Sequence, residues 1–77
     1  MDKLDISDIA PEVIQKVRLA VKDSYPLAVS ENAVRMSVTI RPERIRRVLS
    51  WLVMLDNVER IETTSGTFWR WRDRNGN

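Results

Sequence analysis

The sequence predicts a single α+β domain in which three helices precede a C-terminal β-hairpin. Apolar residues recur at helical spacing over residues 9–23 and 42–55, and a shorter helical segment follows Ser30. Near the C-terminus this spacing gives way to strict alternation, where residues 67–72 read TFWRWR after a Ser-Gly pair. A change from a period of about 3.6 to a period of 2 indicates a change from helix to strand. The 77 residues suffice for one domain, spanning 1–77.

The first helix is expected at about residues 9–23. Pro11 suits its opening turn, where a missing N–H costs little, and Ser7 or Asp8 is expected to cap it. The helix should end before Pro26, because the residue before a proline avoids the α region. One stripe of the helix is apolar and predicts its buried face: Val13, Ile14, Val17, Ala20 and Val21.

The second helix is expected to be short. Residues 27–29 predict a brief extended connection, and Ser30 is a suitable cap for a helix over residues 31–36. The β-branched residues within 37–40 fit a turn better than a helix interior.

The third helix is expected to run from Pro42 to about Leu55. At about 100° per residue, one stripe faces the core and contains Ile45, Val48, Leu49, Leu52 and Leu55. The opposite side carries Glu43, Arg46, Arg47 and Ser50. Trp51 shares a flank with Arg44. Asn57 is expected to end the helix in the left-handed conformation.

The hairpin is predicted from a strand over residues 58–63, a turn around Ser65-Gly66 and a strand over 67–72. Alternation places one set of side chains inward and the other outward. The inner face is expected to hold Ile61, Trp69 and Trp71. The outer face is expected to hold Phe68, Arg70 and Arg72.

The order of the expected elements resembles that of the winged helix-turn-helix family, over roughly residues 11–73. The resemblance is carried by residues 33–38, 41–49, Leu52 and 56–61. The resemblance implies that Ala33 lies where the second and third helices cross closely. Either Val38 or Ile40 then fills the apolar position of the turn between them.

The resemblance further implies that the helix over 41–55 enters the major groove of DNA, with the hairpin over 58–72 as the wing. The expected DNA-binding residues are Arg41, Arg44, Arg46, Arg47, Ser50, Arg70 and Arg72. Residues 35–77 hold nine arginines against five acidic residues, and arginine binds phosphate and guanine in a bidentate way. Glu43 is expected to hold Arg47 by an i,i+4 ion pair. The hypothesis requires Arg46 and Arg47 to be free of the protein's own carboxylates.

The function expected on this basis is a DNA-binding regulator of transcription or replication. Because one small domain makes few phosphate contacts, a homodimer or a larger assembly on double-stranded DNA is expected, through the first helix or the flank of Trp51. The alternative is a winged-helix module for protein association, with an apolar patch of Trp51, Val53 and Met54. An RNA-binding variant is a weaker third hypothesis.

Composition argues against other classes. The chain has no cysteine and no histidine, which removes thiol and imidazole chemistry and most zinc sites. Its acidic residues are scattered, and it has no phosphate-binding glycine loop, so we expect no enzyme, no cofactor and no metal. No apolar run approaches the ~20 residues that span a bilayer, and the acidic N-terminus does not resemble a signal peptide, so a cytoplasmic protein is expected. Residues 1–8 and 74–77 are expected to be frayed.

Overall fold

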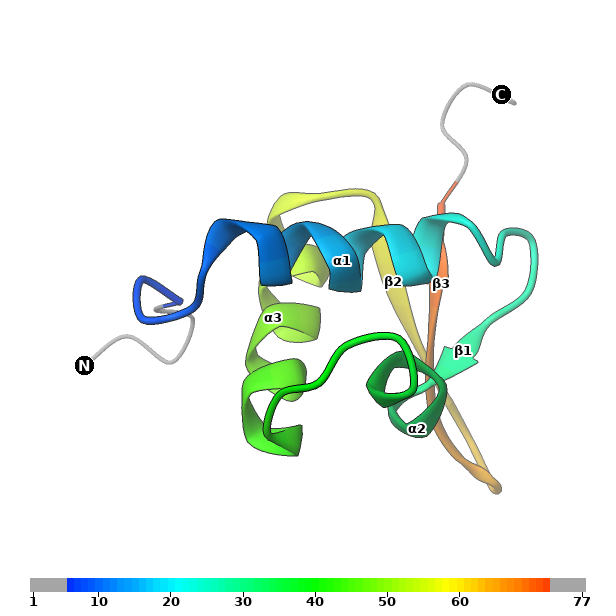
Figure 1. Ribbon diagram of the computed structural model, residues 1–77. Coiled ribbons are helices and arrows are strands. Elements are labelled where there is room, and N and C mark those ends of the chain that lie inside the picture. The colour runs from blue at the N-terminus through cyan, green and yellow to red at the C-terminus, as the bar shows by residue number, and fades with distance from the viewer. Residues whose placement is uncertain (1–5, 73–77) are drawn as a thin grey trace.

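The computed structural model describes residues 6–72 and places three helices against a three-stranded antiparallel sheet (Figure 1). The elements in chain order are α1 (Pro11–Lys22), β1 (Val29–Ser30), α2 (Glu31–Arg35), α3 (Pro42–Leu55), β2 (Val58–Thr63) and β3 (Gly66–Trp71). In the sheet the order is β1-β3-β2, so that β3 is central. This α+β architecture is compatible with a winged helix. The first turn of α3 and the tip of the hairpin lie at the same end of the molecule.

The core lies between the helices and the inner face of the sheet. The stripe predicted for α3 is confirmed at four positions, which are fully buried: Ile45, Val48, Leu49 and Leu52. Leu55 was expected there as well, but it is 65% exposed. It lies at the margin of the stripe, and Asp56 leaves the helix at once in an extended conformation with φ −138°. No described residue other than glycine has a positive φ, so the prediction of a left-handed Asn57 is wrong.

The pairing of β2 with β3 decides which residues face the helices. Trp69 lies directly opposite Arg60, and Trp71 lies opposite Val58. Residues that lie opposite each other share a face of the sheet. Trp69 is buried and Trp71 packs against the core, as predicted. Ile61 was expected beside them, but this register puts it on the outer face, and Val58 fills the inner position instead.

The expected connection over residues 27–29 ends in a strand. Val29 pairs with Trp69 and Ser30 with Phe68, which adds β1 to the edge of the hairpin. A strand of two residues is too short for alternation to reveal it in the sequence. Ser30 also caps α2, as predicted, because its side chain accepts a hydrogen bond from the backbone N–H of Ala33 at 3.2 Å.

The crossing of α2 with α3 differs from the expectation. Ala33 is exposed, and its neighbour Val34 is the fully buried residue of α2. In the turn that follows, Val38 is buried and Ile40 is half-buried.

The segment before α1 packs on the domain. Ile6 and Ile9 are buried in the core, on either side of Ser7 and Asp8. Neither Ser7 nor Asp8 caps α1, because the helix begins at Pro11 with Ala10 as its N-cap and without a side-chain cap. The remainder of the two termini expected to fray, residues 1–5 and 74–77, lies outside the described residues.

Candidate nucleic-acid interface

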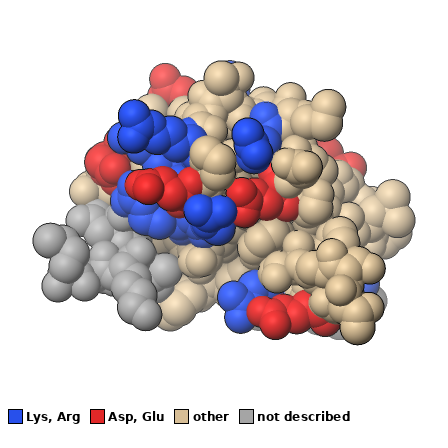
Figure 2. All heavy atoms as spheres, turned by 90° about the horizontal axis from the view of Figure 1, so that it is seen from below, with Lys and Arg blue, Asp and Glu red and all other residues tan. Residues whose placement is uncertain are grey.

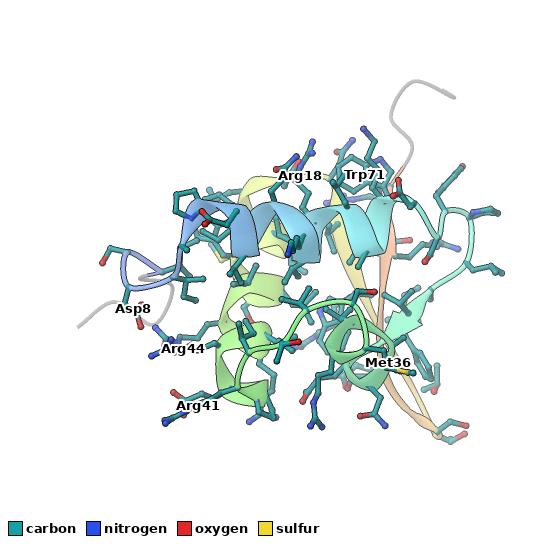
Figure 3. All side chains as sticks on the ribbon, viewed as in Figure 1. Asp8, Arg18, Met36, Arg41, Arg44 and Trp71 are labelled. Atoms are coloured by element: carbon teal, nitrogen blue, oxygen red, sulfur yellow. The ribbon has the colours of Figure 1, made fainter. Side chains whose placement is uncertain are left out.

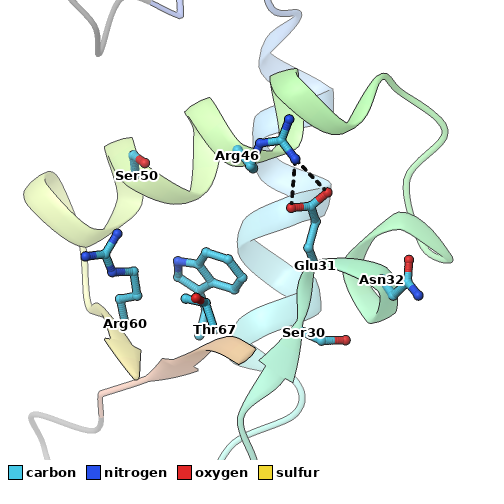
Figure 4. Close-up of a pocket in the computed structure, with 8 residues that line it drawn as sticks. Ser30, Glu31, Asn32, Arg46, Ser50, Arg60 and Thr67 are labelled. Atoms are coloured by element: carbon cyan, nitrogen blue, oxygen red, sulfur yellow. Dashed lines mark hydrogen bonds and ion pairs between the residues drawn. The ribbon is translucent and has the colours of Figure 1, made fainter. Parts of the chain in front are cut away.

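A groove of about 560 Å³ runs between α3 and the hairpin (Figure 4). Its lining residues come from β1, from the start of α2, from α3 and from the two long strands: Ser30, Glu31, Asn32, Arg46, Ser50, Arg60, Thr67 and Trp69. Arg46 and Ser50 are one helical turn apart and point into it from α3. The groove is therefore polar on both walls and has two arginines, one on each side.

Arg46 reaches across the groove to the first residue of α2. Its Nη1 donates hydrogen bonds to both carboxylate oxygens of Glu31, at 3.3 Å and 3.2 Å. The side chain of Arg46 remains 58% exposed, whereas that of Glu31 is only 25% exposed. The carboxylate is thus the more enclosed partner, and the guanidinium lies at the surface.

Four residues that line this groove had no predicted role: Glu31, Asn32, Arg60 and Thr67. Arg60 is the one among them with a positive charge. It reaches from the inner face of β2 toward α3, and its Nη2 lies 3.3 Å from the carboxylate of Glu62. Its side chain is 56% exposed. The signal that could have revealed it is its alternation with Val58, because the two residues are two apart on one strand and share a face.

The other flank of α3 faces the N-terminal segment. Figure 3 shows Arg41 and Arg44 pointing outward along this side, with Asp8 above them. Arg47 donates to both oxygens of Asp8 through two nitrogens, each at 3.1 Å, and lies 4.0 Å from Glu43. The pair with Glu43 was predicted, but the pair with Asp8 was not. Within residues 6–72, Arg41 and Arg44 form no ion pair.

The carboxyl group of Asp8 responds to this surrounding charge. The hydrogen bond from Arg47 lowers the pKa of Asp8 below its ordinary value, and the charges of Arg47 and Arg44 act in the same direction. Asp8 therefore remains ionised at neutral pH, as a fixed negative charge beside two arginines.

The outward side of α3 is consequently not the free cationic surface that the sequence predicted. Arg46 and Arg47 are both paired with the protein's own acids, Glu31 and Asp8. Figure 2 shows the face at this end of the molecule, where blue and red side chains lie next to each other. The resulting surface is of mixed sign.

Arg70 and Arg72 are not brought together with the arginines of α3. Arg70 lies on the outer face of the sheet, where it pairs with Glu59 opposite to it in β2. Arg72 follows the end of β3 that is remote from the hairpin turn, and both residues line a small cleft beside Tyr25. Of the seven predicted residues, Arg46 and Ser50 share the groove, Arg41 and Arg44 lie along the other side of α3 (Figure 3), and Arg47 contacts Asp8.

No protein-family model, no curated protein and no solved structure matches this chain. Over residues 6–72, no helix combines the length and the apolar character needed to cross a membrane. The same part of the chain brings together no group of three acidic side chains that could hold a metal ion.

Proposed function

We propose that the chain is a winged-helix protein that binds double-stranded DNA, with α3 in the major groove and the hairpin over the adjacent backbone. The observation that carries the proposal is the groove between α3 and the hairpin, which has Arg46 on one wall and Arg60 on the other. The major groove is about 12 Å wide and admits one helix. Two guanidinium groups on opposite sides of a groove suit a phosphate strand that passes between them.

Base recognition would come from the exposed side of α3. Ser50 is exposed and lies one helical turn from Arg46, away from the buried stripe. A serine hydroxyl can contact several bases. Arg41 and Arg44 at the start of α3 are placed for phosphate contacts at the edge of the site.

The ion pairs with Glu31 and Asp8 do not meet the requirement that Arg46 and Arg47 be free of the protein's own acids. DNA binding is therefore proposed with these ion pairs as bonds that DNA has to replace. Both pairs are at the surface, and an exposed ion pair contributes only about 0–1 kcal/mol. A DNA phosphate can therefore replace a carboxylate at Arg46 without disturbing the core. The cost of that exchange reduces the affinity of a single domain, which favours binding as a homodimer or in a larger assembly.

Selection of bound duplexes from a random pool tests the proposal. We expect the selected duplexes to share a sequence that weakens binding when it is mutated, and their half-site spacing would give the number of domains bound. Arg46→Ala should weaken binding to all duplexes by similar factors, because it removes a phosphate contact, whereas Ser50→Ala should relax the preference at one base pair. A pool that yields no enriched duplex at low salt would contradict DNA binding.

Protein association is the second candidate function, and the last turn of α3 favours it. Met54 and Leu55 are adjacent and are 66% and 65% exposed. Val53 and Trp51 were expected to join Met54 in an apolar patch, but both pack against the core. Sedimentation velocity over a range of concentrations checks this function. Self-association that is abolished by Met54→Glu, with DNA binding absent, would favour it over the first.

A further inference from the structure

Glu31 and Asp8 each pair with an arginine on the side of α3 that the proposed interface turns to DNA. Glu31 accepts from Arg46 at 3.2 Å and 3.3 Å, and Asp8 accepts from two nitrogens of Arg47 at 3.1 Å. Both arginines lie on the outward side of α3. A carboxylate and a phosphate present the same chemistry to a guanidinium group, namely two anionic oxygens in one plane with it.

Asp8 is held in place by packing on both sides of it in the sequence. Ile6 and Ile9 are 9% and 6% exposed and belong to the core. The backbone N–H of Ile9 also donates to the carbonyl of Ile6 at 2.9 Å, which closes a turn around Asp8. The carboxylate is therefore presented to α3 by a segment that is anchored on both sides of Asp8.

Glu31 is positioned in a comparable way by the junction of β1 with α2. Ser30 pairs with Phe68 in the sheet and caps α2 through Ala33, which determines where the next residue lies. The side chain of Glu31 lies within the groove and is 25% exposed. Of the two partners, Arg46 is the one that can turn away to meet a ligand.

We propose that Glu31 and Asp8 act as internal competitors for the DNA phosphates, so that binding exchanges one ion pair for another and sequence-independent binding is suppressed. This inference rests on the DNA-binding function proposed above. Once Arg46 or Arg47 turns to DNA, the carboxylate it leaves remains close to the phosphates and repels them. This cost applies to every duplex, whereas base contacts from α3 offset it only on a duplex of the right sequence.

The exchange has a measurable salt signature. An arginine that neutralises a phosphate releases a condensed cation from the DNA. Each such contact makes the slope of the logarithm of the binding constant against the logarithm of the salt concentration steeper by about 0.9. An arginine that leaves its own carboxylate exposes a new anion, which attracts a cation in return. We therefore expect the protein to have a shallower salt dependence than its arginines alone would give.

The experiment compares Glu31→Gln and Asp8→Asn with the wild-type protein on a short duplex of arbitrary sequence. Binding is followed by fluorescence anisotropy between about 50 and 200 mM salt. Both substitutions preserve the shape of the side chain and replace the charged carboxylate with a neutral amide. Asp23→Asn is the matched control, because Asp23 is exposed and forms no ion pair within the described residues. It makes the same change in net charge at a distance from α3.

We expect Glu31→Gln to bind the arbitrary duplex about two- to fivefold more tightly than the control, which is the range that the loss of an exposed ion pair allows. Its salt dependence should steepen by up to about 0.9. Asp8→Asn should change both quantities in the same direction. If either variant fails to fold, as seen by circular dichroism, the other still provides the test.

The outcomes separate the two proposals. If the wild-type protein binds DNA and neither substitution strengthens binding more than the control does, the internal competition is overturned and DNA binding stands. Binding by the variants alone supports the competition strongly. Absence of binding by all proteins at the lowest salt overturns DNA binding, and the competition with it.

Discussion

Arg60 of β2 lies directly across the hairpin from Trp69 of β3, so its side chain shares the face of the sheet that looks toward α3. Arg70, one residue further along β3, lies opposite Glu59 and faces the other way. The two arginines belong to the same hairpin, but their side chains lie on opposite faces of the sheet. This difference gives the hairpin one arginine inside the groove and one outside it.

Because the two arginines lie on opposite faces of the sheet, their substitutions should affect DNA binding differently. Arg60→Ala should weaken binding to all duplexes by similar factors and flatten the logarithmic salt dependence by up to about 0.9, because one phosphate contact is lost. Arg70→Ala removes the same charge from the outer face and should change neither quantity beyond the general effect of net charge. Anisotropy titrations at several salt concentrations measure both. A larger effect of Arg70→Ala would mean that DNA lies on the outer face of the sheet.

Trp69 is expected to carry much of the stability of the hairpin. It is 7% exposed and packs in the core beneath the groove. Trp69→Ala should lower the free energy of unfolding by about 3–5 kcal/mol, because it leaves a large cavity. That loss is enough to unfold many small domains. Leu55→Ala is the control: at 65% exposure it should cost no more than about 0.5 kcal/mol. Equal denaturant midpoints for the two variants would contradict this assignment of the core.

The helices could be predicted from the sequence because their signals are local. Pro42 opens α3 as expected, and the apolar stripe at a spacing of three and four residues identified its buried face down to Leu52. The inner face of β3 could also be predicted, since Trp69 and Trp71 alternate with arginines. In each case the evidence for the element is contained in the element itself.

The features that the sequence did not reveal depend on partners distant in the chain. Ile61 was placed on the wrong face because its phase is set by the register with β3. Asp8 and Arg47 pair although they are 39 positions apart, and neither segment of the sequence indicates this contact. The sequence could therefore predict which residues of α3 point outward. It also predicted the local pair of Arg47 with Glu43, but it could not predict the pairs with the distant acids Glu31 and Asp8.

Arg18 joins the C-terminal ends of α3 and β3 to α1, and its removal should destabilise the fold. Its Nε donates to Asp56 at 2.7 Å, and its guanidinium lies 5.0 Å from the centre of the Trp71 ring (Figure 3). Arg18→Ala should cost about 1–2 kcal/mol of unfolding free energy, from the loss of a half-buried ion pair and a cation–π contact. Chemical denaturation measures this cost.

Two variants show whether the effect of Arg18 comes from these contacts. Arg18→Lys should recover part of the loss, because it keeps the charge but not the planar fork. Lys16→Ala removes a charge from an exposed position of the same helix and should be nearly neutral. If Lys16→Ala were as costly as Arg18→Ala, the loss would come from net charge or helix propensity, and the contacts of Arg18 would not explain it.

The contact between Asp8 and Arg47 should make the N-terminal segment sensitive to acid. The hydrogen bond from Arg47 lowers the pKa of Asp8, with a further contribution from the charge of Arg44. A carboxyl group whose pKa is lower in the folded state stabilises that state above its unfolded pKa, which is about 3.9 for aspartate. This stabilisation should be fully present at neutral pH. It should be lost as the pH falls below about 4 and through the lowered value.

Titration of the Asp8 carboxyl carbon by NMR measures this effect directly. In Arg47→Gln the pKa of Asp8 should rise toward the ordinary aspartate value, because the hydrogen bond and the nearest charge are both removed. Arg44→Gln should raise it less, since Arg44 acts on Asp8 through its charge and without a hydrogen bond. A pKa of Asp8 that is ordinary in the wild-type protein, or that Arg47→Gln leaves unchanged, would show that the two residues are not paired in solution. The competition proposed for Asp8 would then not hold at Arg47.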